Sequence, residues 1–236
     1  MKQSITTRLS SCLLSCTALA LGQFTNSARA TVVEMDGLTV TDEFTVAMSS
    51  GSPPLGQPLI FDAQFLTIAP TGTLDIKNNG VIVRTGNFAT LEGYAITGYG
   101  GGPGGPGGWD GPGVNSSIAA EDPTHLTAVG VISNAEAGRT EFYGVTGLGT
   151  GLETFYLYTY YGDANLDRDV NLDDLALMGT GSGWYHGDFN YSGSVDAADL
   201  ALFQASYIAL HPPIPEPGVA GLIAIGALGC MGRRRR

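Results

Sequence analysis

The sequence predicts a mainly β domain, either a sandwich or a short β-helix, followed by a small α-helical module. Three observations predict this fold class. Residues 31–160 are rich in Thr, Val, Ile and Phe broken by Gly and Pro, which is typical of short strands. Residues 161–210 carry one loop-and-helix pattern twice. The terminal segments 1–30 and 211–236 each contain an apolar run, expected as an N-terminal signal helix and a C-terminal hydrophobic helix.

Residues 1–30 have the pattern of a secretory signal peptide. Two basic residues precede the apolar run 13–21, and Ala28-Arg29-Ala30 supplies a small-residue cleavage site before Thr31. A lipoprotein signal ending at Cys16 is the alternative, but it leaves only a short apolar stretch ahead of that cysteine. All three cysteines lie in the two terminal segments, so we expect a secreted region without disulfides.

Removing both terminal segments makes the charge strongly negative. Residues 31–217 carry four basic and 22 acidic residues, a formal charge of −18. Such a chain attracts divalent cations and repels phosphates, so we expect no nucleic-acid partner.

The expected strands lie between 73 and 161. Asn78-Asn79-Gly80 separates the β-branched runs 73–76 and 81–84, a pattern that favours a hairpin. Further strands are expected at 126–132, 141–145 and 155–161, a short helix at 87–97 and a helical turn at 116–121. The Gly-rich segment 98–113 is expected as a loop. We expect Trp109 within it to pack against the β domain, the alternative being an aromatic platform for sugars.

Two segments, 162–178 and 187–203, repeat one pattern of oxygen-bearing side chains. They are identical at eight of 17 positions at an offset of 25 residues. Numbered from Asp163 and Asp188, the loops 163–174 and 188–199 carry Asp or Asn at positions one and three and Asp at position twelve. This spacing surrounds a hard cation with oxygen ligands, as in an EF-hand-type Ca²⁺ loop.

We therefore predict two Ca²⁺ sites, each with ligands at positions one, three, five, seven, nine and twelve. The first set is Asp163, Asn165, Asp167, Asp169 (through its carbonyl), Asn171 and Asp174, and the second is Asp188, Asn190, Ser192, Ser194 (through its carbonyl), Asp196 and Asp199.

Each loop departs from the pattern once. Position six usually requires Gly for a sharp turn, but the first loop has Arg168 there, which predicts backbone strain of about 1 kcal/mol. The second loop keeps Gly193 but has Ser192 in place of a carboxylate. We expect both loops to bind, with unequal affinity. The alternative, in which Asp174 and Asp199 only cap helices, explains one Asp per repeat and leaves the upstream oxygens unexplained.

The closing Asp, the helix after each loop and the 25-residue spacing resemble dockerin type I repeats. The resemblance covers roughly residues 160–210 and implies a module of 161–210 that folds with calcium and docks onto cohesin-like proteins. The family docks through loop positions ten and eleven. Here these are Leu172-Asp173 and Ala197-Ala198, which depart from the hydroxyl pair that the family uses to dock.

The C-terminal segment 211–236 resembles a PEP-CTERM sorting signal. Pro215-Glu216-Pro217 is followed by the apolar run 218–232 and four arginines. About fifteen apolar residues are short for a span, which needs roughly 20. The resemblance implies transient insertion of 218–232 in the inner membrane and removal of the tail by an exosortase-type enzyme. A plain C-terminal anchor is the alternative.

The whole layout resembles exported dockerin-repeat proteins common in planctomycete-type bacteria, expected at the cell surface, in the outer envelope or outside the cell. We expect a non-catalytic Ca²⁺-binding role in adhesion or envelope structure. The alternative is a polysaccharide-acting hydrolase or carbohydrate-binding module, which requires two positioned carboxylates. The acids considered for such a pair are scattered: Asp62, Asp75, Glu92, Asp110 and Glu141.

Overall fold

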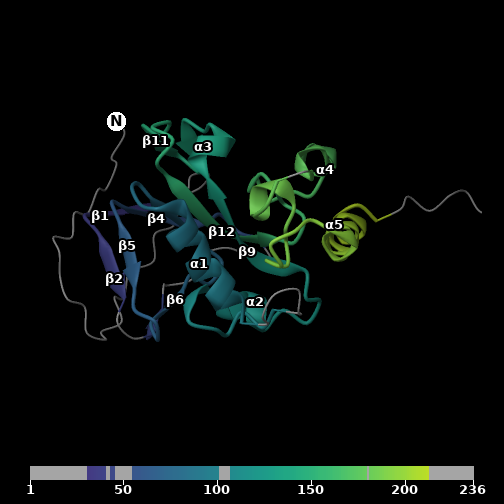
Figure 1. The fold of residues 1–236 in the computed structure, drawn as a ribbon, viewed down its shortest axis with the longest axis horizontal. Coiled ribbons are helices and arrows are strands. Elements are labelled where there is room, and N and C mark those ends of the chain that lie inside the picture. The colour runs from purple at the N-terminus through teal and green to yellow at the C-terminus, as the bar shows by residue number, and fades with distance from the viewer. Residues whose placement is uncertain (1–30, 41–42, 46–54, 101–106, 180, 213–236) are drawn as a thin grey trace, which may run out of the picture.

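The computed structural model of the protein describes residues 31–40, 43–45, 55–100, 107–179 and 181–212. The fold is mixed α/β, mostly sheet with few helices. Figure 1 shows helix α1 (Phe88–Tyr99) lying across the sheets and the repeats of the 161–210 region packed at one end of them. The predicted β region therefore contains more helix than its composition suggested.

Strands in the first half of the chain form three parallel stacks. The first holds β1 (Thr31–Met35), β4 (Leu59–Ala63) and β7 (Gly80–Val83); the second holds β2 (Leu38–Val40) and β5 (Leu66–Ile68); the third holds β3 (Glu43–Thr45), β6 (Thr73–Asp75) and β8 (Gly113–Asn115). The chain visits the stacks in the same order twice, and on its third pass α1 replaces the middle strand. Of the two predicted architectures, this stacking is that of a short β-helix.

The hairpin predicted around Asn78-Asn79-Gly80 is wrong. β6 and β7 lie in different sheets, and β7 pairs in parallel with β4. The turn has its positive φ at Lys77, at 54°, two residues before the Asn79-Gly80 pair that favoured the hairpin. Asn79 instead links two successive passes of the chain through the strand stacks, which we call coils. Its Oδ1 accepts a hydrogen bond from the Leu59 amide at 3.0 Å. Long-range stacking has overridden the local turn preference.

The central sheet ends in two long antiparallel strands. β12 (Thr154–Tyr160) pairs with β7 on one side and with β9 (Thr127–Ser133) on the other. Both are buried along their whole length because both faces are covered. On one face the Tyr156 hydroxyl donates to the Leu91 carbonyl of α1 at 2.7 Å. On the other, a Cβ at Gly130 would lie 2.5 Å from Leu166 and 2.7 Å from Trp184. These strands confirm the predicted ones.

The connection between β9 and β12 consists of a short helix, a hairpin and a loop. α3 (Asn134–Ala137) follows β9, and β10 (Glu141–Phe142) and β11 (Val145–Thr146) form a hairpin where one strand was predicted. The hairpin turns at Tyr143 and Gly144, both with positive φ. The Glu153 carboxylate accepts hydrogen bonds from the amides of residues 149–151 and from Asn134 Nδ2. Glu153 therefore ties the connection to the start of β12.

Both ends of the Gly-rich segment 98–113 belong to regular elements, where a loop was predicted. α1 extends the predicted helix to Tyr99, and β8 begins at Gly113. α1 approaches β8 so closely that a Cβ at Gly98 would lie 1.9 Å from the Val114 carbonyl oxygen, which explains a glycine within the helix. The predicted helical turn forms as α2 (Ser117–Ala120). Trp109 is 2 % exposed, which confirms its predicted burial.

The predicted signal peptide and sorting tail lie outside the described residues. Within the described residues, no helix has both the length and the apolar character needed to cross a membrane.

We predict that Glu153→Gln lowers the free energy of unfolding at pH 7 by about 2 kcal/mol, because a buried carboxylate loses its charge-assisted hydrogen bonds. Burial raises the pKa of Glu153, but the hydrogen bonds from Asn134 and Thr150 more than offset it, and the net pKa falls to about 2. A depressed pKa stabilises the fold above the ordinary value of 4.5 and loses that contribution as pH falls toward 2. Denaturant titrations should show the two proteins converging between pH 4.5 and 2; a pH-independent difference would contradict this role.

Candidate metal centre

The two predicted loops begin where the β-rich region ends. The first, 163–174, follows β12 after Tyr161-Gly162 and leads into α4 (Leu172–Leu177). The 3₁₀ turn η1 (Trp184–His186) then leads to the second loop, 188–199, and to α5 (Ala197–Leu210). One helix follows each loop, as predicted.

The carboxylate at position one is buried and bonded in the same way in both loops. Asp163 accepts hydrogen bonds from the amides of positions five and six at 3.0 and 2.9 Å. Asp188 accepts the same two at 2.8 Å each. Asp163 is fully buried and Asp188 is 2 % exposed. The sequence repeat is therefore a repeat of structure.

The closing carboxylates also match between the loops. Asp174 accepts from the amides of positions three and nine at 3.2 and 2.9 Å. Asp199 accepts from positions two, three and nine at 2.8, 3.1 and 2.9 Å. Helix capping thus takes a different form from the one considered in the sequence. Position nine, Asn171 or Asp196, is the N-cap, and the closing Asp completes a capping box.

Both loops turn through left-handed residues at positions four and six. At position four φ is 58° for Leu166 and 53° for Tyr191; at position six it is 70° for Arg168 and 87° for Gly193. The strain predicted at Arg168 is confirmed. Its guanidinium donates to the carbonyls of Gly56 and Asn78 at 2.5 and 2.8 Å. These contacts with the β region offset the cost of a non-glycine residue there.

The predicted ligand residues at positions five to nine lie nearer the surface, whereas Asn190 at position three of the second loop is buried. Asp167 and Asp169 of the first loop and Ser194 and Asp196 of the second are exposed, and Ser192 is half-buried. Asn165 Nδ2 donates to Asp167 Oδ2 at 3.0 Å, whereas Asn165 Oδ1 is buried and accepts no hydrogen bond. Asn165 Oδ1 stands at a predicted ligand position, and a buried oxygen without a hydrogen-bond donor is suited to contact a cation in the first loop.

Side chains of His, Cys, Asp and Glu do not by themselves gather into a metal-binding group of three or more anywhere in the described residues. The predicted ligand sets depend on more than those residue types, because Asn165, Asn171, Asn190, Ser192 and two backbone carbonyls contribute oxygens. Such mixed oxygen sets are what Ca²⁺ takes. The residues therefore fit calcium by donor chemistry, and the carboxylates as placed bond mainly to backbone amides.

Burial perturbs the acids of the loops. It raises the pKa of Asp163 to about 8, with the nearby charges of Asp174 and Asp167 adding to the effect. Burial likewise raises the pKa of Asp174 to about 6 and raises that of Asp188. Acids crowded in this way gain most from a bound cation, which neutralises them together.

Several residues that hold the first loop were not predicted from sequence. The Thr159 hydroxyl bonds to Asp163 Oδ2, and Arg139 donates to the Asn165 carbonyl. Tyr143 donates to the Leu166 carbonyl at 3.3 Å. Of these, only Thr159 is near the loop in sequence, so the local pattern gave no signal for the others.

The repeats share one core with the sheets. Trp184 is fully buried and donates from Nε1 to the Asp163 carbonyl at 2.6 Å. Tyr191 donates to the Val129 carbonyl of β9 at 2.8 Å, and its ring packs near Trp109 and Trp184, with centroids 6.2 and 5.6 Å away. The repeats therefore pack directly against the β region.

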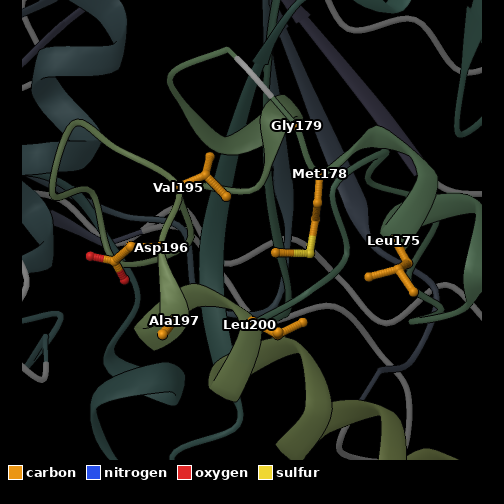
Figure 2. Close-up of a pocket in the computed structure, with 7 residues that line it drawn as sticks. All are labelled: Leu175, Met178, Gly179, Val195, Asp196, Ala197 and Leu200. Atoms are coloured by element: carbon orange, nitrogen blue, oxygen red, sulfur yellow. The ribbon is translucent and has the colours of Figure 1, made fainter.

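An apolar pocket lies between the two repeats (Figure 2). Leu175, Met178 and Gly179 line it from the first repeat, and Val195, Asp196, Ala197 and Leu200 from the second. Met178 extends toward Leu200 across the space between the helices. Leu172, at loop position ten, begins α4, and 65 % of it is exposed.

Two of the acids considered for hydrolysis are held in ion pairs. Asp62 accepts from Arg84 through both oxygens at 2.8 and 2.6 Å, and Asp75 lies 3.0 Å from Lys77 Nζ. Each of the two carboxylates is therefore paired with a basic side chain, Asp62 with Arg84 and Asp75 with Lys77.

Searches against protein-family models, curated proteins and solved structures gave no match to this chain.

We predict that, with calcium removed by a chelator, stability falls as pH rises from about 4 to 8. The raised pKa of Asp163 means that the folded state keeps a proton that the unfolded state releases over this range, so rising pH favours unfolding. Asp163→Asn cannot titrate, so its stability should depend less on pH. Chemical denaturation across this range tests the difference, with Asp173→Asn, an exposed acid outside the ligand set, as control. Parallel pH profiles for wild type and Asp163→Asn would contradict it.

Proposed function

We propose that this chain is an exported, surface-directed Ca²⁺-binding protein whose repeats form a dockerin-like module and whose role is structural rather than catalytic. One observation carries the proposal. Two loops 25 residues apart hold buried carboxylates at positions one and twelve with matching hydrogen bonds and matching left-handed turns. A shared backbone geometry around alternating oxygens supports a shared ligand.

Calcium would supply charge neutralisation. Asp163, Asn165, Asp167, Asn171 and Asp174 would hold the first ion together with the Asp169 carbonyl. Each ligand set has three side-chain carboxylates, but the first loop as a whole contains five acids and one arginine and the second only three acids, with Ser192 at position five. We propose that the less acidic second loop binds more weakly. The strong negative charge of residues 31–217 raises the local concentration of divalent cations near both.

The destination follows from the terminal segments. We propose export through the inner membrane on the signal of residues 1–30 and processing by an exosortase-type enzyme at Pro215-Glu216-Pro217, with delivery to the cell surface, the outer envelope or the medium. A cohesin-like protein or a polysaccharide is the proposed class of partner. The apolar pocket between the repeats supports the former.

We predict that calorimetric titration of the chelated protein with Ca²⁺ detects two sites of unequal affinity, and that circular dichroism shows helix content rising on binding, because metal binding and folding are linked. Asp167→Asn should weaken the first site without removing the second. Asp173→Asn removes the same charge from the same segment outside the ligand set and should leave both sites nearly unchanged. The absence of heat and of spectral change at millimolar Ca²⁺ would refute calcium binding.

We further predict that protein recovered from the cell surface or medium lacks the residues beyond Pro215-Glu216-Pro217. Intact-mass spectrometry checks this, and substitution of Glu216 by Ala should leave the longer form in the membrane fraction. Recovery of the full C-terminus on the exported protein would refute processing.

A further inference from the structure

The first loop is bonded to the β region through one residue that also touches a predicted ligand. The amide of Arg168 donates to Asp163 Oδ2 at 2.9 Å. Its guanidinium donates to the carbonyls of Gly56 and Asn78, which precede β4 and β7. The same group lies 5.6 Å from the centre of the Tyr143 ring. Arg168 therefore connects the ligand sphere to residues 90 and 112 positions away in sequence.

An arginine here is unfavourable for the loop taken alone. A φ of 70° costs a non-glycine residue roughly 1–2 kcal/mol, and the second loop has Gly193 at the same place. A guanidinium near a cation site also repels the cation. Both effects would disappear with glycine. What the arginine adds is contact with the β region, through two charge-assisted hydrogen bonds and an aromatic ring.

The coil segments that receive these bonds are also bonded to each other. Asn79 Oδ1 accepts from the Leu59 amide, so the turn before β7 is joined to the start of β4. Arg168 donates to the carbonyls of Gly56 and Asn78, three residues before Leu59 and one before Asn79. A displacement of Arg168 would therefore disturb the hydrogen bonds of both segments, the one before β4 and the one before β7, at the same time.

We propose that Arg168 is a positioning residue that couples calcium in the first loop to the stability of the coil segments 55–61 and 76–81. This rests on the proposed calcium binding. Ordering of Asp163 by the ion fixes the amide of Arg168, and this holds the guanidinium on the two carbonyls. By linkage, the β region in turn pre-organises the first loop for calcium. The second loop, with Gly193, has no such arm and binds without this coupling.

The test is hydrogen exchange on the mature chain with and without Ca²⁺, read in segments 55–61 and 76–81. In the wild type we expect Ca²⁺ to slow exchange there about tenfold, the scale of one charge-assisted hydrogen bond. Arg168→Met should abolish this slowing while calorimetry still finds two sites. Arg168→Lys, which retains one donor group on a flexible stem, should restore part of it and remains informative if the methionine variant does not fold.

Asp188→Asn is the matched control, because it disables the second loop and should leave the slowing in 55–61 and 76–81 intact. Absence of calcium heat in the wild type would refute the proposed function itself. Two results would overturn the coupling and leave calcium binding standing. One is calcium binding without slowed exchange in these segments of the wild type. The other is slowing in both Arg168 variants that equals the slowing in the wild type.

Discussion

The structure depends on one fully buried carboxylate at the junction of sheet and repeats. Asp163 begins the first loop directly after β12, where its oxygens accept hydrogen bonds from Thr159 and from two loop amides. Its carbonyl accepts from the Trp184 indole, which leads into the second loop. A buried charge is costly unless it is bonded or neutralised. The loop geometry and the packing of the repeats are built around this buried group, and the proposed calcium ion would neutralise it.

Around Asp163 the β region and the repeats form one unit. Trp184 and Tyr191 place the second repeat against β9 and the ring of Trp109, and Arg168 holds the first repeat against the coils. This differs from a module joined to a domain by a flexible linker. The pocket lined by Leu175, Met178 and Leu200 lies between the two repeats, beside the helices α4 and α5.

Local patterns predicted what depends on local spacing. The repeated spacing predicted a loop at 163–174 followed by a helix, and both form, with Asp163 and Asp174 bonded to amides within the loop. That these residues bind calcium stays a prediction. The Asn78-Asn79-Gly80 hairpin failed because pairing between coils decides that turn. The contacts of Tyr143 and Arg139 with the first loop were not predicted, because these residues lie 23 and 26 positions from the residues they contact. The sequence separates strands from loops more readily than it assigns their long-range neighbours.

The most direct measurement is a crystal structure of the mature chain grown with Ca²⁺, using anomalous scattering to identify the ion. We predict one ion in each loop, with oxygen ligands from positions one, three, five, seven, nine and twelve at about 2.3–2.6 Å. We also predict that Arg168 still bonds to the carbonyls of Gly56 and Asn78. Loops without anomalous density at millimolar Ca²⁺, and with their carboxylates bonded only to backbone amides, would contradict the central claim that these repeats are calcium sites.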